Sequence, residues 1–312
     1  MARSVLSAPH FQDEVAAFAY VEAHLWPHGP VCPHCGTTGD KIGKLQGKTT
    51  RAGLYKCYGC RKPFTVRMGT IFEDSHLALR LWLQVIHLMC ASKKGISTRQ
   101  IQRLLNCSMK TAWHLTHRIR FAMEVDPSAG PIGGAGKIVE ADEAFLSKSP
   151  RTKKRPGYQH KIAILSLVER GGKIRSEVLD APPSKGTIMP LIAKHVHPAS
   201  ILHTDGAQFY KHPWQVAAHA SVDHSKAEYA RKEEGGTVHV NTLEGYFSVF
   251  KRGMIGTYQH VGSQHLHRYV AEFDFRQNNR EALGVDDVQR SAAALKGFAG
   301  KRLTYETTTE QP

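Results

Sequence analysis

The chain of 312 residues is 41% hydrophobic, which is enough to bury a core and excludes a wholly disordered polymer. It carries 42 Lys and Arg against 27 Asp and Glu, and the net charge of +15 favours a polyanionic partner such as double-stranded DNA over an ordinary basic enzyme. No run of about 18 apolar residues occurs, and the N-terminus lacks the apolar core of a signal peptide, so we expect a cytoplasmic protein without membrane contacts.

After an N-terminal helical segment at 1–28, the chain holds two Cys-x-x-Cys pairs. Their members are Cys32, Cys35, Cys57 and Cys60. Four thiolates at this spacing suit one tetrahedral Zn²⁺, and the polar, hairpin-like segment between the pairs predicts a zinc ribbon over residues 29–68. His34 is a rival ligand, but we expect it to be part of the turn. The zinc is expected to be structural because four protein ligands leave no coordination position for chemistry.

Residues 69–126 have a helical pattern. Residues 75–91 are apolar on almost every side, which predicts a buried helix. The patterns at 95–106 and 108–120 meet at a tight turn, which is the layout of a helix-turn-helix whose second helix enters the major groove of DNA; a plain helical hairpin is the alternative. We expect four side chains of the second helix to contact DNA: Lys110, Thr111, His114 and Arg118.

The Pro/Gly-rich stretch 127–136 is a linker, and the domain that follows, at 137–285, has strand-like patterns. We predict strands at 137–145, 160–169, 173–179 and 199–204, and helices at 184–195, 239–252 and 266–280. The predicted fold class is therefore α/β, an RNase H-like catalytic domain preceded by a zinc ribbon and a helix-turn-helix. Residues 286–312 are assigned to a C-terminal tail.

Two aspartates fall where α/β sheets commonly bind ligands. Asp142 lies inside the first predicted strand, and Asp205 lies at the carboxyl end of the fourth. A helix across the sheet can bring Glu244 between them, and three oxygen ligands suit Mg²⁺ or Mn²⁺. The alternatives are that Asp205 belongs to a turn and that Asp142, with Glu140 and Glu143, forms a solvated acidic edge.

The helix at 239–252 has one apolar face and one polar face, and the polar face holds a single carboxylate, Glu244. Asn241 and Glu244 also have the spacing of a capping box, with Asn as the N-cap and Glu three residues later. The capping box and the metal site do not exclude each other.

Three blocks of the sequence carry a family resemblance: Val139–Ala144, His203–Gly206 and His239–Arg252. They resemble the signature blocks of bacterial insertion-sequence transposases, in the ISXO-like group of the DDE superfamily, which has an N-terminal zinc ribbon. The resemblance implies a DNA transposase that binds the terminal inverted repeats of an insertion sequence. It also implies metal-dependent DNA cleavage and strand transfer, and pairing of two element ends by a homo-oligomer.

The resemblance also assigns roles to residues. Asp142 and Asp205 match the first two acidic ligands of the catalytic Mg²⁺ or Mn²⁺. The third ligand of the group is Glu or Asn; we favour Glu244 because a carboxylate neutralises the cation better than an amide, and Asn241 stays open. Lys251 matches the lysine that follows, and we expect it to contact a phosphate or developing charge.

Further basic residues are candidates for DNA contacts. Arg252 follows the catalytic lysine, and the predicted loop 148–161 contains Lys153, Lys154 and Arg155, which are expected to bind the DNA backbone; a solvated loop is the alternative. Two other functions remain open at this point. The chain could be a non-catalytic DNA-binding regulator, including a domesticated transposase, or a stand-alone nuclease on the same fold.

Overall fold

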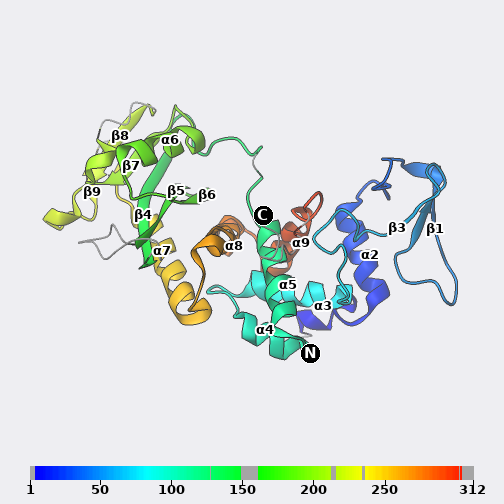
Figure 1. The fold of residues 1–312 in the computed structure, drawn as a ribbon. Coiled ribbons are helices and arrows are strands. Elements are labelled where there is room, and N and C mark those ends of the chain that lie inside the picture. The colour runs from blue at the N-terminus through cyan, green and yellow to red at the C-terminus, as the bar shows by residue number, and fades with distance from the viewer. Residues whose placement is uncertain are drawn as a thin grey trace, which may run out of the picture. The chain divides into compact units, whose positions relative to one another are not determined.

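A computed structural model describes most of the chain: residues 4–126, 128–148, 161–211, 216–233, 236–301 and 303. The chain divides into two compact units. One comprises Met1–Glu124 and Asp286–Pro312, and the other comprises Val125–Val285 (Figure 1). Among the described residues, no helix has both the length and the apolar character needed to cross a membrane.

The first unit begins with two helices and a small sheet. The helices are α1 (Pro9–Gln12) and α2 (Glu14–Leu25), and α2 starts where the Asp13 side chain accepts a hydrogen bond from the Ala16 N–H at 2.7 Å. The antiparallel sheet has the order β1-β2-β3, with bounds Ile42–Lys44, Tyr55–Cys57 and Pro63–Phe64. Its small core is made by Cys32, Tyr55, Cys57 and Phe64.

Three helices follow the sheet: α3 (Leu79–Ala91), α4 (Thr98–Leu105) and α5 (Met109–Ala122). As expected from the sequence, α3 is buried along most of its length. Helices α4 and α5 pack together and are joined by a turn in which Asn106 adopts a left-handed conformation, φ 47°. Two helices joined by a tight turn are the arrangement that the helix-turn-helix prediction requires.

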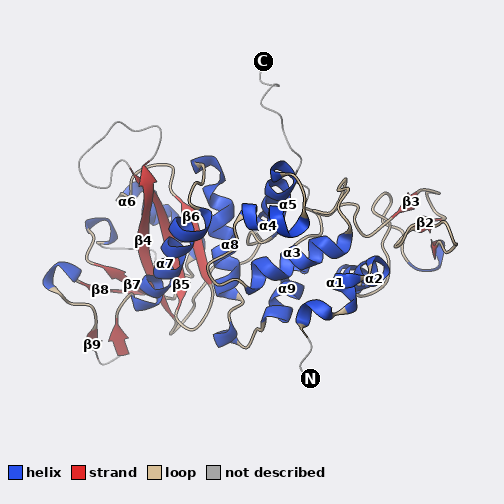
Figure 2. Cartoon of the chain, turned by 90° about the horizontal axis from the view of Figure 1, so that it is seen from below, coloured by secondary structure: helices blue, strands red, loops and turns tan. Residues whose placement is uncertain are grey.

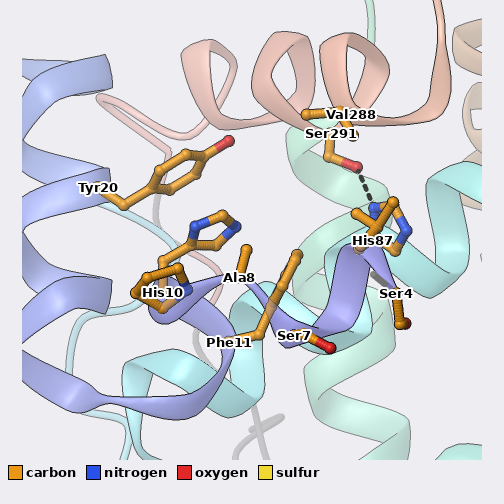
Figure 3. A pocket seen from close by; sticks show the side chains of 11 residues that line it. Ser4, Ser7, Ala8, His10, Phe11, Tyr20, His87, Val288 and Ser291 are labelled. Carbon is orange, nitrogen blue, oxygen red and sulfur yellow. Dashed lines mark hydrogen bonds between the residues drawn. The ribbon is translucent and has the colours of Figure 1, made fainter. Parts of the chain in front are cut away.

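The C-terminal segment does not end the chain as a simple tail. Residues 286–312 were expected to form a tail, but Asp287–Lys296 forms helix α9, which starts with a capping box from Asp286 and packs on α3. His87 of α3 hydrogen-bonds Ser291 of α9 at 3.2 Å, beside a cavity of about 340 Å³ (Figure 3). The tail assignment was therefore wrong for this stretch, because two apolar positions of α9 are buried in the first unit.

The second unit is a five-stranded sheet of order β6-β5-β4-β7-β8 (Figure 2). The strands are β4 (Ile138–Lys148), β5 (Lys161–Glu169), β6 (Ile174–Val178), β7 (Ile201–Asp205) and β8 (Ala218–Val222). Strand β5 runs antiparallel to both of its neighbours, β4 and β6, and β7 and β8 run parallel to β4. A separate antiparallel pair, β9 (Arg231–Glu233) and β10 (Gly236–Val238), precedes α7. The unit is thus α/β, as predicted.

Each face of the sheet has its own core. Helix α6 (Lys185–His195) packs on the face that holds Val139 and Ala141, whereas α7 (Asn241–Gly253) and α8 (Leu266–Asn278) pack on the face that holds Ala144. Because side chains alternate along a strand, Glu140 and Asp142 share the face covered by α7. The predicted DNA-contacting side chains at 153–155 lie outside the described residues.

Candidate functional site

The four predicted zinc ligands come together in the first unit. The sulfur of Cys32 lies 3.7 Å from that of Cys60, and the sulfur of Cys35 lies 3.7 Å from that of Cys57. All four sulfurs lie within 4.8 Å of one another, and His34 is not in the cluster. A tetrahedral ion with Zn–S bonds of about 2.3 Å would separate its sulfurs by about 3.8 Å, so the cluster fits a structural Zn²⁺.

In the second unit, the strand register brings the two aspartates side by side. Strands β4 and β7 are parallel, and Ala141 pairs with Thr204. Asp142 and Asp205 are the next residues on the two strands, so they lie on the same face of the sheet, about 4.8 Å apart at the backbone. Asp142 accepts a hydrogen bond from the Glu143 N–H at 2.7 Å, and Asp205 accepts one from the Ala207 N–H at 3.0 Å.

Helix α7 brings Glu244 to the same face. Glu244 lies in the first turn of α7, and its side chain is 45% exposed. The helix is held on the sheet by its apolar face, including Leu243, Phe247 and Phe250, which pack with the β4 and β5 side chains. His224 contributes an imidazole nitrogen 3.9 Å from the Glu244 carboxylate.

The pKa of Asp142 depends on the charges of the other three predicted catalytic groups, Asp205, Glu244 and Lys251. Burial raises the pKa of Asp142 to about 7, the Glu143 N–H lowers it, the negative charges of Asp205 and Glu244 raise it further, and Lys251 lowers it. Among the described residues, the cysteine cluster is the only set of three or more ligand atoms within 4.8 Å of one another. The three acids therefore interact through space without forming a closed ligand set.

The start of α7 differs from the predicted capping box. Val240 is the N-cap, and it has no side-chain acceptor, whereas Asn241 is already the first helical residue. The carboxylate of Glu140, from β4, takes the place of a local cap: it accepts hydrogen bonds from the Thr242 N–H at 3.0 Å and the Leu243 N–H at 3.4 Å. The capping-box prediction was wrong because Val240, which is fully buried, begins the helix one residue earlier.

The two glutamates next to Asp142 do not form a solvated acidic edge. Glu140 is completely buried. Glu143 points to the opposite face, where Tyr210 donates a hydrogen bond to its carboxylate, and burial raises the pKa of Glu143 to about 8. Neither carboxylate is thus a freely solvated charge, and the alternative stated from the sequence is excluded.

A buried histidine lies beside the acid pair. His203 is two residues before Asp205 on β7 and is 5% exposed. Burial, followed by the positive charges of Arg170 and His239, lowers the pKa of His203 to about 4. The imidazole is therefore neutral at pH 7, and its Nδ1 accepts a hydrogen bond from Arg170 at 3.2 Å.

Only part of the predicted DNA-contacting set on α5 is exposed. Lys110 is exposed, and Thr111 and His114 are half-buried. Arg118 is 5% exposed; it donates a hydrogen bond to the Glu73 carbonyl at 2.6 Å and lies over the Trp82 ring. The prediction that Arg118 is an exposed DNA contact was wrong, because the segment before α3 covers this side of α5. All four side chains border a cavity of about 570 Å³.

The end of α7 leaves its two basic residues on the surface. Lys251 and Arg252 are exposed, and the Arg252 Nε donates to the Ser248 carbonyl at 3.0 Å. The Lys251 ammonium lies 6.0 Å from the centre of the Phe247 ring. Lys251 thus combines an exposed charge with an electrostatic effect on Asp142.

Comparisons with known proteins agree with this arrangement. Residues 133–278 match the ISXO2-like transposase domain, and residues 12–63 match the transposase zinc-ribbon domain. The chain belongs to the ISXO2-like transposase family. A relative, an uncharacterized protein in transposable element ISH50 of Halobacterium salinarum, is 26% identical over 277 residues, which cover 83% of this chain and 90% of the relative. Asp142, Asp205 and Glu244 lie in the matched transposase domain, and the four cysteines lie in the matched zinc-ribbon domain.

Proposed function

We propose that this ISXO2-like transposase binds the ends of an insertion sequence and performs metal-dependent DNA cleavage and strand transfer. The observation that carries the proposal is that the parallel strands β4 and β7 place Asp142 beside Asp205 on the sheet face covered by α7, whose Glu244 and Lys251 also act on the pKa of Asp142. The strand order, with three antiparallel strands followed by two parallel ones, supports an RNase H-like fold for this domain. The membership of the chain in a transposase family supports the same reaction.

The residues present fit a hard divalent cation. Asp142, Asp205 and Glu244 offer only carboxylate oxygens, and burial, followed by the negative charges of Asp205 and Glu244, raises the pKa of Asp142 to about 7. When bound, Mg²⁺ or Mn²⁺ activates the attacking oxygen and stabilises the leaving oxygen of a phosphodiester. Asn241 is exposed in the same first turn and is the alternative third ligand. Lys251 would contact a phosphate beside the acids.

The DNA-binding surface is proposed to include the first half of α5. Lys110, Thr111 and His114 occupy the second helix of the helix-turn-helix order, and the net charge of +15 supports backbone binding. Arg252 extends the basic character of the catalytic domain near Lys251. Pairing of two element ends requires at least two copies of the chain, so we propose a homo-oligomer on DNA.

The test is cleavage of DNA that contains an element end. Asp142→Asn and Asp205→Asn should abolish Mg²⁺-dependent cleavage while gel-shift binding is retained, and the exposed Asp180→Asn in the same unit is the matched control. If the two active-site variants cleave like the wild type, the site assignment fails. Joining of the cut end to target DNA distinguishes a transposase from a nuclease, and binding without cleavage by the wild type would instead favour a regulator.

A further inference from the structure

Glu140 is a buried carboxylate close to Asp142 and Asp205. The proposed reaction does not use it. It is 0% exposed, and it lies two residues before Asp142 on the same face of β4. A buried carboxylate is strongly destabilising unless charged and hydrogen-bonding partners compensate it. The partners of Glu140 therefore indicate what this carboxylate does.

Most of these partners belong to the first turn of α7. The Glu140 carboxylate accepts hydrogen bonds from the Thr242 N–H at 3.0 Å, the Leu243 N–H at 3.4 Å and the Thr242 hydroxyl at 2.9 Å. With Val240 as the N-cap, Thr242 and Leu243 occupy the two positions whose N–H groups an N-cap side chain normally satisfies. A negative charge at this end of a helix is also favoured by the helix dipole.

Arg170, in the turn between β5 and β6, compensates the charge of Glu140. Its Nε donates to the Glu140 carboxylate at 3.0 Å. The same guanidinium donates to the Thr237 carbonyl at 2.9 Å and the His239 carbonyl at 3.2 Å, and to His203 Nδ1 at 3.2 Å. One side chain thus joins β4 and β7, which carry the aspartates, to the segment that leads into α7.

We propose that Glu140 and Arg170 are positioning residues that hold the first turn of α7, and with it Glu244, over the aspartate pair. Thr242 is two residues before Glu244, and Glu140 is two residues before Asp142, so a single carboxylate connects the strand of the first acid with the helix of the third. The apolar side chains of α7 pack the helix against the sheet. The hydrogen bonds to Glu140 are directional, so they fix the position of its first turn. This inference rests on the proposed function, since it explains how the proposed third ligand is placed.

The first experiment measures metal affinity with Glu140→Gln and with the exposed Glu281→Gln as its matched control. The amide keeps an acceptor but loses the charge that Arg170 and the helix end require. We expect the Mn²⁺ concentration for half-maximal DNA cleavage to rise by about 10- to 100-fold, and Mn²⁺ binding to the DNA-free protein, followed by electron paramagnetic resonance, to weaken in parallel. Cleavage at saturating Mn²⁺ should recover, which a merely unfolded site would not allow.

Thr242 provides a milder pair of variants that preserves the fold. Thr242→Val removes only the hydroxyl that donates to Glu140, whereas Thr242→Ser keeps it. We expect Thr242→Val to raise the half-maximal Mn²⁺ concentration by about three- to tenfold and Thr242→Ser to behave like the wild type. Hydrogen exchange of the Thr242 and Leu243 amides should accelerate in Glu140→Gln and in Thr242→Val, but not in Glu281→Gln.

The outcomes separate this inference from the proposed function. If the wild type cleaves DNA and Glu140→Gln and Thr242→Val keep the wild-type Mn²⁺ dependence, the positioning role is overturned and the transposase proposal stands. If the wild type does not cleave, Mn²⁺ binding still decides: weaker binding in Glu140→Gln supports the positioning role, and unchanged binding overturns it.

Discussion

Asp274 gives a quantitative test of the packing that holds α7 in place. This residue of α8 is 3% exposed and accepts hydrogen bonds from the Tyr246 hydroxyl at 2.6 Å and the Ser176 hydroxyl at 2.8 Å. It thereby links α8 to α7 and β6. Burial raises the pKa of Asp274 from 3.8 to about 6, although both hydroxyls lower it. The folded protein thus holds this proton more tightly than the unfolded chain.

The sign of the effect on stability follows from this difference. Below about pH 3.8 the carboxyl is protonated in both states and costs nothing; as the pH rises toward about 6 the unfolded chain ionises first, and stability is lost. At about 1.4 kcal/mol for each pH unit, the interval between 3.8 and about 6 corresponds to about 3 kcal/mol. Above about pH 6 the loss is complete and stays constant.

Asp274→Asn should remove this pH dependence because the amide keeps an acceptor and carries no charge. Because the unfolded carboxyl is already partly ionised at pH 4, we expect the free energy of unfolding of the wild type, relative to the variant, to fall by about 2 kcal/mol between pH 4 and pH 7. Hydrogen exchange of β5 and α8 peptides in increasing urea reports the second unit alone. Asp180→Asn, an exposed control, should show no such difference. If the difference in free energy of unfolding between the wild type and Asp274→Asn is the same at pH 4 and at pH 7, the reasoning is refuted.

Three further predictions concern the zinc, the DNA surface and the third ligand. Atomic emission should find one Zn²⁺ per wild-type chain and none in Cys57→Ser, and retention of stoichiometric zinc in the variant would contradict the four-cysteine site. Lys110→Ala should reduce the slope of log affinity for DNA against log salt by about one, whereas Arg118→Ala should mainly lower the melting temperature, because Arg118 is buried. Glu244→Gln should reduce Mg²⁺-dependent cleavage by at least about 100-fold and Asn241→Ala by less than about tenfold; the reverse order would make Asn241 the ligand.

Features with a strong local signal could be predicted from the sequence. Two Cys-x-x-Cys pairs restrict the chain to few geometries, and the structure brings all four sulfurs together. Asp142 lies inside β4 and Asp205 at the end of β7, as predicted, and both strands are largely buried. Serine N-caps are another local signal: Ser97 and Ser108 begin α4 and α5, and each side chain accepts a hydrogen bond from the N–H three residues later.

Features that depend on distant contacts could not be predicted in the same way. Strand β8 was missed because it has only five residues and few of them are strongly apolar. It is stabilised as a strand by its pairing with β7. Helical periodicity places Lys110 and Arg118 on one side of α5, but it does not reveal which part of that side another segment covers. The cap of α7 comes from Glu140, which is 102 residues from Thr242, so no local pattern at the helix start could indicate it.

Glu140 and Asp142 show how one strand can hold a fully compensated carboxylate close to a proposed metal ligand. Both side chains lie on the same face of β4 and have the same chemistry. Glu140 is fully buried, and a guanidinium and two helix N–H groups compensate its charge within the protein. Asp142 has a nearby N–H donor, but burial, followed by two negative neighbours, raises its pKa to about 7. A divalent cation would supply the missing compensation at Asp142 and has nothing to add at Glu140, which is why the chemistry is assigned to the second acid of the block and the placement of α7 to the first.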